Sequence, residues 1–231
     1  MPIIVTASSK GGAGKSTLTL VLAQALDDMG ASVTIVDADP NRPILRWRGG
    51  KSTSGVQVVG DVTESSIIKV IREQSAKRQF VLVDLEGTAN RLVSRAITQA
   101  DLVLIPLQAS ALDSNEASRA VGLIQEEEEA LGGRSIPFRI IMTRTNPQIT
   151  TRIEAGIYRS LAQANIPLMK VRLHERQAYK AIFVHRLSLR ELGENVNGLE
   201  AAHANAERLA EEVVELITAQ PNQQEEAHAH A

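Results

Sequence analysis

Short apolar runs rich in β-branched residues alternate along the chain with longer stretches of helical periodicity. The apolar runs predict seven strands, at residues 3–7, 33–37, 56–59, 80–84, 102–106, 139–143 and 167–171. Helical patterns occupy 16–29, 64–77, 90–99, 113–131, 149–164 and 199–218. Several strand runs lack polar alternation, as in strands buried on both faces of a parallel sheet. The pattern predicts a doubly wound, mostly parallel α/β sheet flanked by helices, with ligands at the carboxyl ends of the strands.

The length and composition fit a single domain of this class. With 231 residues, 43% of them hydrophobic, the chain can bury one substantial core. We expect this domain to cover residues 1–219, followed by a polar, disordered tail at 220–231. The absence of cysteine excludes disulfides, thiolate zinc sites and cysteine-ligated iron–sulfur clusters. No leader and no membrane-length apolar run are visible, so we expect a cytoplasmic protein.

Charge is unevenly distributed, although the formal net charge is only −2. Between positions 139 and 190, basic residues greatly outnumber the two acidic ones, Glu154 and Glu175. After position 190 the chain is acidic, and Arg208 is its only basic residue. The balance argues against a uniformly basic nucleic-acid binder but allows a local positive face. Ordinary solvated helix faces would give the same pattern, and both interpretations stay open.

The most specific pattern is K-G-G-A-G-K-S-T at residues 10–17. It lies between a predicted strand and a predicted helix, which is the context of a phosphate-binding loop. Glycines there let backbone N–H groups converge on phosphate oxygens, and the helix start adds its positive dipole end. We expect Lys15 to meet the β- and γ-phosphates and the Ser16 hydroxyl to bind magnesium. The residues expected to bind the nucleotide are Lys10, Gly11, Gly12, Ala13, Gly14, Lys15, Ser16 and Thr17.

Three acidic residues complete this candidate site. Asp37 ends one predicted strand and Asp39 follows it, while Asp84 ends another strand in the position of a Walker B aspartate. Phosphoryl transfer requires a magnesium ion held partly by an acid and a group that orients the attacking water. Asp84 suits the magnesium shell, while Asp37 and Asp39 suit switch and water-orienting roles. Any one of these acids could instead cap the next helix.

The adenine contacts are weakly signalled. Arg144, followed by Asn146 and Pro147, comes after the sixth predicted strand, where a base could lie. This assignment of Arg144 rests on topology alone.

The loop, the D-A-D-P segment at 37–40 and the apolar strand ending V-D-L-E-G at 83–87 together resemble the ParA/MinD family of deviant Walker ATPases. The similarity covers nearly the whole chain, including D-L-V-L-I-P at 101–106. The short length resembles the small plasmid ParA proteins. Residues 37–48 and His174-Glu175-Arg176 also resemble the VirC-type ATPases that act on DNA transfer origins.

The resemblance implies roles for particular residues. Lys10 matches the signature lysine that reaches the partner's phosphates in a nucleotide-sandwich dimer, so an ATP-induced homodimer is expected. Lys15 and Asp39 match catalytic positions, and Asp39 is the aspartate needed for hydrolysis. Ser16, Asp37 and Asp84 match the groups around magnesium. A lysine supplied in trans makes the site incomplete in a monomer, which explains slow hydrolysis.

Family members also bind DNA without sequence preference through basic residues near the carboxyl end. Arg172 and Arg208 match family positions best, and Arg176 and Lys180 lie nearby in the sequence. Arg208 could instead be a helical partner of Glu211 or Glu212.

Three positions depart from the family pattern. Leu85 and Glu86 stand where many members carry small or proline residues, which affects the magnesium environment. Ala111 replaces a second proline, which affects proline-dependent polymer contacts.

The main hypothesis is a ParA-type partition ATPase. Its cofactors would be ATP and Mg²⁺, and its partners non-specific DNA and a centromere-binding or cargo adaptor that stimulates hydrolysis, so we expect association with the nucleoid. The alternative is a VirC-like accessory DNA-binding ATPase at a conjugative or T-DNA transfer origin. A MinD-like membrane protein is disfavoured because the last helix is acidic, so no membrane binding is expected. A nitrogenase-reductase relative would need cysteines for its cluster.

Overall fold

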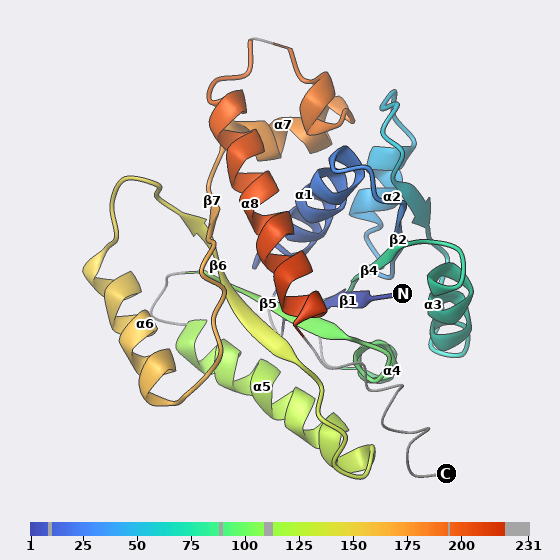
Figure 1. Cartoon of the computed structure of the whole chain (residues 1–231), viewed down its shortest axis with the longest axis vertical. Helices are drawn as coiled ribbons and strands as arrows, with labels where there is room; N and C mark the ends of the chain where they lie inside the picture. Colours follow the sequence, from blue (N-terminus) through green and yellow to red (C-terminus); the bar gives the residue numbers. More distant parts are fainter. Residues whose placement is uncertain (9–10, 88–89, 109–112, 194, 220–231) are drawn as a thin grey trace.

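The computed structural model describes residues 1–8, 11–87, 90–108, 113–193 and 195–219 of the chain, so the expected tail at 220–231 lies outside it (Figure 1). The predicted α/β class is confirmed by seven parallel strands in the order β3-β2-β4-β1-β5-β6-β7. The strands are β1 (Ile3–Thr6), β2 (Val33–Asp37), β3 (Gln57–Val59), β4 (Phe80–Asp84), β5 (Leu102–Gln108), β6 (Phe138–Thr145) and β7 (Leu173–His174). The helices are α1 (Lys15–Asp28), α2 (Pro43–Arg48), α3 (Ile67–Ser75), α4 (Arg91–Ile97), α5 (Asp113–Ala130), α6 (Arg152–Gln163), α7 (Gln177–His185) and α8 (Leu199–Thr218), with a 3-10 turn, η1, at Leu189–Glu191.

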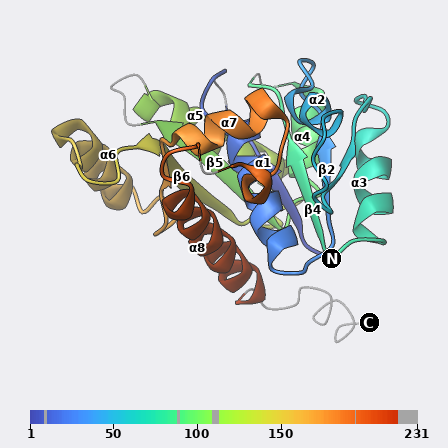
Figure 2. The same ribbon diagram turned by 90° about the horizontal axis from the view of Figure 1, so that it is seen from above.

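Helices cover both faces of the sheet (Figure 2). Because side chains alternate along a strand, neighbouring residues of β1 face opposite layers. Ile4 packs in the layer formed by α1, α2, α7 and α8, whereas Val5 packs in the layer formed by α3, α4, α5 and α6. The central strands are therefore apolar on both sides, as their uninterrupted hydrophobic runs predicted.

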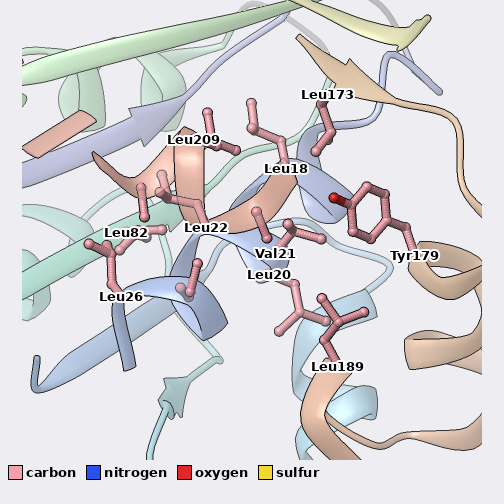
Figure 3. Close-up of a cluster of buried hydrophobic side chains, with 14 of the residues drawn as sticks. Leu18, Leu20, Val21, Leu22, Leu26, Leu82, Leu173, Tyr179, Leu189 and Leu209 are labelled. Carbon is pink, nitrogen blue, oxygen red and sulfur yellow. The ribbon is translucent and has the colours of Figure 1, made fainter. Parts of the chain in front are cut away.

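Helix α1, which begins at the glycine-rich loop, is buried along most of its length. Leu18, Leu22 and Leu26 are at most 1% exposed and pack in one cluster with Leu82 of β4 and Leu209 of α8 (Figure 3). Each such side chain contributes about 1.5–3 kcal/mol when removed from water. The loop is thus attached to one of the most firmly packed helices of the domain.

The strand predicted at 167–171 is wrong. Leu168 forms only a single bridge with Ile140, and β7 begins five residues later than this bridge, at Leu173. The backbone N–H groups of Lys170 and Val171 instead donate to the carboxylate of Glu212 on α8, each at 2.7 Å. A tertiary contact with α8 therefore replaces the strand pairing that the local pattern favoured.

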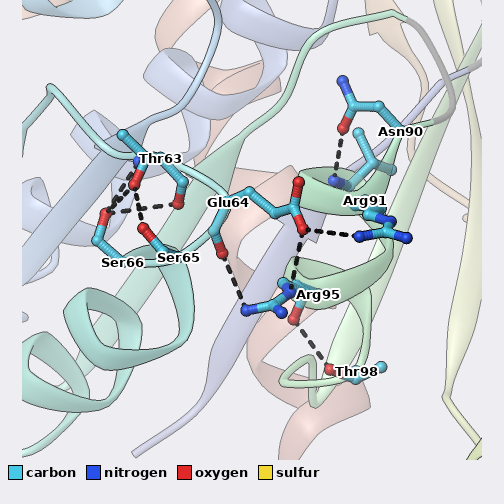
Figure 4. Close-up of polar contacts among 9 residues, drawn as sticks. Thr63, Glu64, Ser65, Ser66, Asn90, Arg91, Arg95 and Thr98 are labelled. Atoms are coloured by element: carbon cyan, nitrogen blue, oxygen red, sulfur yellow. Dashed lines mark hydrogen bonds and ion pairs between the residues drawn. The ribbon is translucent and has the colours of Figure 1, made fainter.

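Exposed polar contacts join α4 to the loop before α3 (Figure 4). Asn90 caps α4, since its Oδ1 accepts from the Val93 N–H at 3.0 Å. The Glu64 carboxylate lies 3.7 Å from Nη1 of Arg91 and 3.9 Å from Nε of Arg95. All three charged side chains are largely solvent-accessible, so these pairs stabilise the fold only weakly.

Candidate nucleotide-binding site

The glycine-rich loop connects the end of β1 to the start of α1. Gly12 and Gly14 have φ angles of +80° and +96°, a region that side chains rarely adopt. The carbonyl of Gly12 accepts from Gln108 Nε2 at 2.6 Å, and that of Ala13 accepts from the Thr143 hydroxyl at 2.9 Å. These bonds fix the loop against β5 and β6, so the loop shape is formed without a ligand.

Lys15 and Ser16 occupy the first turn of α1, as the loop pattern predicted. Lys15 is 6% exposed, and burial lowers the pKa of its ammonium group. The negative charges of Asp84, Asp39 and Glu86 act in the opposite direction on that pKa. The structure therefore brings together the lysine and the acids that the sequence placed on separate strands.

Asp84 lies at the end of β4 and is completely buried. Burial raises the pKa of its carboxyl group from 3.8 to about 7, while the nearby Ser16 hydroxyl lowers it and the Asp37 charge raises it. Among the residues that the structure describes, neither carboxylate oxygen of Asp84 has a hydrogen bond of normal geometry. An unpaired buried carboxylate is costly, which indicates a cationic ligand at this position.

The residues around Asp84 fit a magnesium ion. Magnesium is usually held by one or two protein oxygens together with phosphate oxygens and water. Asp84 and the Ser16 hydroxyl supply such oxygens next to the phosphate loop. Within the described ranges, no three His, Cys, Asp or Glu side chains converge on one point, so a metal held by protein side chains alone has no candidate there.

Asp37 has a structural role at the start of α2. Its Oδ2 accepts from the N–H groups of Ile44 at 3.0 Å and Leu45 at 2.7 Å, in the first turn of α2. Burial raises the pKa of its carboxyl group, and these backbone donors lower it. For Asp37, the helix-capping alternative therefore describes the structure, while direct contact with magnesium stays a prediction.

Asp39 lines an open cavity of about 380 Å³ above the loop, which we call the phosphate cavity. One of its oxygens accepts from the Asn41 N–H at 2.7 Å. The cavity is also lined by Gly11, Gly12, Gly14, Lys15, Ser16, Thr17, Asn41, Glu86, Gly87 and Arg144. The cavity thus brings together Asp39, Arg144 and the described loop residues other than Ala13, which does not line it, whereas Lys10 lies outside the described residues.

A second, smaller cavity of about 170 Å³ adjoins the first. It shares Gly14, Thr17 and Arg144 with the phosphate cavity and extends between β6, β7 and α7. Its walls include the aromatic rings of Tyr179 and Phe183. The backbone of Arg144 has a φ of 52°, which turns the chain sharply at this wall. The predicted strand ended before Arg144, whereas β6 continues to Thr145, so Arg144 lies within β6 and lines this cavity.

Four basic residues predicted to bind DNA lie near the end of β7. The pKa of His174 is lowered mainly by burial and further by the positive charges of Arg176, Arg172 and Arg208. Arg172 also binds the buried carboxylate of Glu154 at 2.9 Å. The structure thus gathers the three arginines, although Arg172 has a structural partner as well.

Lys180 and Arg208 differ in their local contacts. Lys180 pairs with Glu175 at 2.7 Å on the surface. Arg208 is exposed, and its Nε donates to the Ala204 carbonyl of its own helix. Within the described ranges no ion pair joins Arg208 to Glu211 or Glu212, and Glu212 binds the backbone before β7, so the alternative of a helical ion pair is wrong.

Gln108 and Thr143, which donate to the loop carbonyls, were not among the predicted site residues. Both lie at or near the carboxyl ends of predicted neighbouring strands. Since all parallel strands end at the same edge as β1, polar residues there were the available signal. Neither residue belongs to the loop motif, so the motif alone could not identify it.

The chain resembles proteins of known families over nearly its whole length. The family described as VirC1 protein matches residues 1–220. A protein named ParA from Rhizobium radiobacter is 42% identical over 219 residues, which cover 94% of this chain and 98% of that protein. A protein named virC1 from Rhizobium rhizogenes is 29% identical over 192 residues, which cover 79% of this chain and 80% of that protein.

Solved structures share the fold at lower sequence identity. A variant of Cyanothece McdA in complex with ATP superposes with a TM-score of 0.72 at 19% identity, covering 92% of this chain and 96% of that one. The cell division ATPase MinD from Pyrococcus furiosus gives a TM-score of 0.69 at 18% identity, covering 93% and 99%. These structural matches show the fold, and the sequence matches show the family: the chain belongs to the VirC1 family, and its relatives include a protein named ParA.

Proposed function

We propose that this protein is a magnesium-dependent ATPase of the ParA type, which hydrolyses ATP to ADP and phosphate and uses the cycle to position a plasmid or other cargo. The observation that carries the proposal is the buried, unpaired carboxylate of Asp84 beside Lys15 and Ser16. The relative named ParA and a superposed structure that contains ATP support it.

Each residue of the site would have its own role in phosphoryl transfer. The helix start and Lys15 would neutralise the β- and γ-phosphates, and Ser16 with Asp84 would hold magnesium. When bound, magnesium neutralises charge that develops on the phosphate oxygens. Asp39 would orient the attacking water, because it lines the open cavity two residues after the end of β2, the strand that pairs with β4. The second cavity, with Arg144 and Tyr179, would take the adenine base.

Substitutions of Asp39 and Lys15 test these roles. Asp39→Ala should retain ATP binding and lose turnover, whereas Lys15→Ala should lose ATP binding. Binding is measured with a fluorescent ATP analogue and turnover by phosphate release. Full turnover in Asp39→Ala would overturn the role given to Asp39.

We further propose that ATP induces a homodimer completed by Lys10 from each copy. Lys10→Ala should keep ATP binding but lose dimerisation and hydrolysis. Size-exclusion chromatography with ATP and with ADP measures the first effect. Normal ATP-dependent dimerisation of the variant would remove Lys10 from this role.

The dimer would bind nucleoid DNA through the arginines around His174, and a centromere-binding or cargo adaptor would stimulate hydrolysis and release it. Phosphate contacts by these arginines predict binding that falls steeply with salt. We would compare DNA binding with ATP, ADP and no nucleotide for wild type and Arg208→Glu. Arg159→Glu is a matched control, because Arg159 is also exposed and also donates its Nε to a carbonyl one turn back on its own helix.

We expect Arg208→Glu to lose the ATP-dependent DNA binding and Arg159→Glu to keep it. This result would support both the nucleotide cycle and DNA binding by the arginines around His174. Salt-insensitive binding would contradict the proposal.

No helix in the described part of the chain has the length and hydropathy to cross a bilayer. The acidic α8 also predicts that liposomes will not retain the protein.

A second candidate is an accessory ATPase for DNA transfer, favoured by the VirC1 family match over residues 1–220. The two functions differ in DNA specificity. Tight binding to a transfer-origin fragment that resists competition by random duplex would favour the transfer role. Equal competition by any duplex would favour partition.

A further inference from the structure

Glu86 is a cavity-lining carboxylate that the proposed reaction does not use. It follows Asp84 by two residues, at the exit of β4. The intervening residue, Leu85, is 0% exposed and packs in the core layer of α3, α4, α5 and α6. Burial of Leu85 anchors this segment, while Glu86 lines the phosphate cavity together with Lys15 and Asp39.

The carboxylate of Glu86 differs from its neighbours in its contacts. Asp37 accepts from the backbone N–H groups of α2, and Asp39 accepts from that of Asn41. For Glu86, no hydrogen bond or ion pair occurs within the described residues, and its recorded interaction is the long-range attraction to Lys15. No donor in the described ranges therefore offsets its negative charge.

The described cavity already holds much negative charge. Asp39 and Glu86 line it and Asp84 lies buried beside it, against the cations Lys15 and Arg144. A nucleoside triphosphate adds more negative charge than a diphosphate, and its extra phosphate lies at the magnesium side of a phosphate loop. A carboxylate at that side repels the extra phosphate unless a divalent cation offsets both charges.

We propose that Glu86 makes binding of the triphosphate depend on magnesium: without the cation the site rejects ATP more strongly than ADP, and with the cation this difference disappears. The inference rests on the proposed ATPase site and adds a regulation to it. Free ATP without its metal would not occupy the site and block it. Coulomb repulsion between two charges that share one partly hydrated cavity is enough for about a tenfold change in affinity.

The test is equilibrium binding of ATP and ADP, each in magnesium and in EDTA. In Glu86→Gln, we expect ATP binding in EDTA to strengthen about tenfold relative to wild type. ADP in EDTA should change less, and either nucleotide in magnesium should change little. Glu73→Gln is the control, because Glu73 is a half-exposed surface carboxylate on α3 that does not line the cavity.

A second variant guards against indirect effects. Glu86→Asp keeps the charge and should keep the magnesium dependence of wild type, and urea unfolding checks that both variants are folded. Unchanged ATP binding of Glu86→Gln in EDTA would overturn the inference, as would an equal change in EDTA and in magnesium. If wild type binds neither nucleotide in magnesium, the proposed ATPase function itself fails. If wild type binds ATP and Glu86→Gln keeps the wild-type magnesium dependence, only the inference about Glu86 fails.

Discussion

Replacing Asp84 by asparagine should stabilise the nucleotide-free protein and remove part of its pH dependence. Asp84 is fully buried without a hydrogen bond of normal geometry, and its pKa rises from 3.8 to about 7 on folding. Below about pH 4, the carboxyl group is protonated in both the folded and the unfolded chain. Between about pH 4 and 7, the unfolded chain loses this proton and the folded chain keeps it.

Stability therefore falls as pH rises through this window. One pH unit corresponds to 1.36 kcal/mol, so the full window is worth at most about 4 kcal/mol. Asparagine has a similar shape and carries no charge, so Asp84→Asn should be more stable than wild type at about pH 8 by a large part of that amount. Near pH 4 the two proteins should be about equally stable.

The assay is urea unfolding of both proteins at several pH values between about 4 and 8. Other groups, such as Asp28 and Asp101, also have raised pKa values, so the difference between the two proteins is the quantity to follow. Saturating Mg·ATP should flatten the wild-type slope, because a bound cation favours the charged carboxylate. The same pH slope in both proteins, or lower stability of Asp84→Asn at about pH 8, would falsify the assignment of Asp84 as an uncompensated buried acid.

Three further substitutions test contacts that support the site. Arg172→Leu leaves Glu154 buried without its partner and should lower the free energy of unfolding by about 3 kcal/mol, measured with urea; an unchanged midpoint would show that the pair is not needed. Leu209→Ala opens a cavity against α1 and should cost about 2–5 kcal/mol in the same assay, unlike an exposed substitution on α8. Thr143→Val removes the donor to the Ala13 carbonyl and should weaken ATP binding about fivefold with a small change in stability; wild-type affinity would show that the loop holds its shape unaided.

The sequence predicted the elements whose patterns are local. Continuous apolar runs identified β1, β2, β4 and β5, because a strand buried on both faces needs no polar alternation. The glycine motif identified the loop, and the rule that ligands lie at the carboxyl ends of strands brought Asp39, Asp84 and Arg144 to one edge. Chemistry concentrated in short motifs could therefore be predicted well.

Features that depend on distant partners could not be predicted. The segment at 167–171 has a strand-like composition, but Glu212 on α8 takes its backbone donors. Arg208 could not be separated from an ordinary helical ion pair until Glu212 was found to bind elsewhere. The short helix α2 is six residues long and is held by Asp37, so its own periodicity is too brief to give a signal.

The two walls of the phosphate cavity are fixed to opposite faces of the sheet. The loop continues into α1, whose Leu18, Leu22 and Leu26 lie in one buried cluster. Glu86 and Gly87 directly follow Leu85, which is 0% exposed and packs in the other cluster. A core substitution on one face of the sheet should therefore displace one wall of the cavity and leave the opposite wall in place.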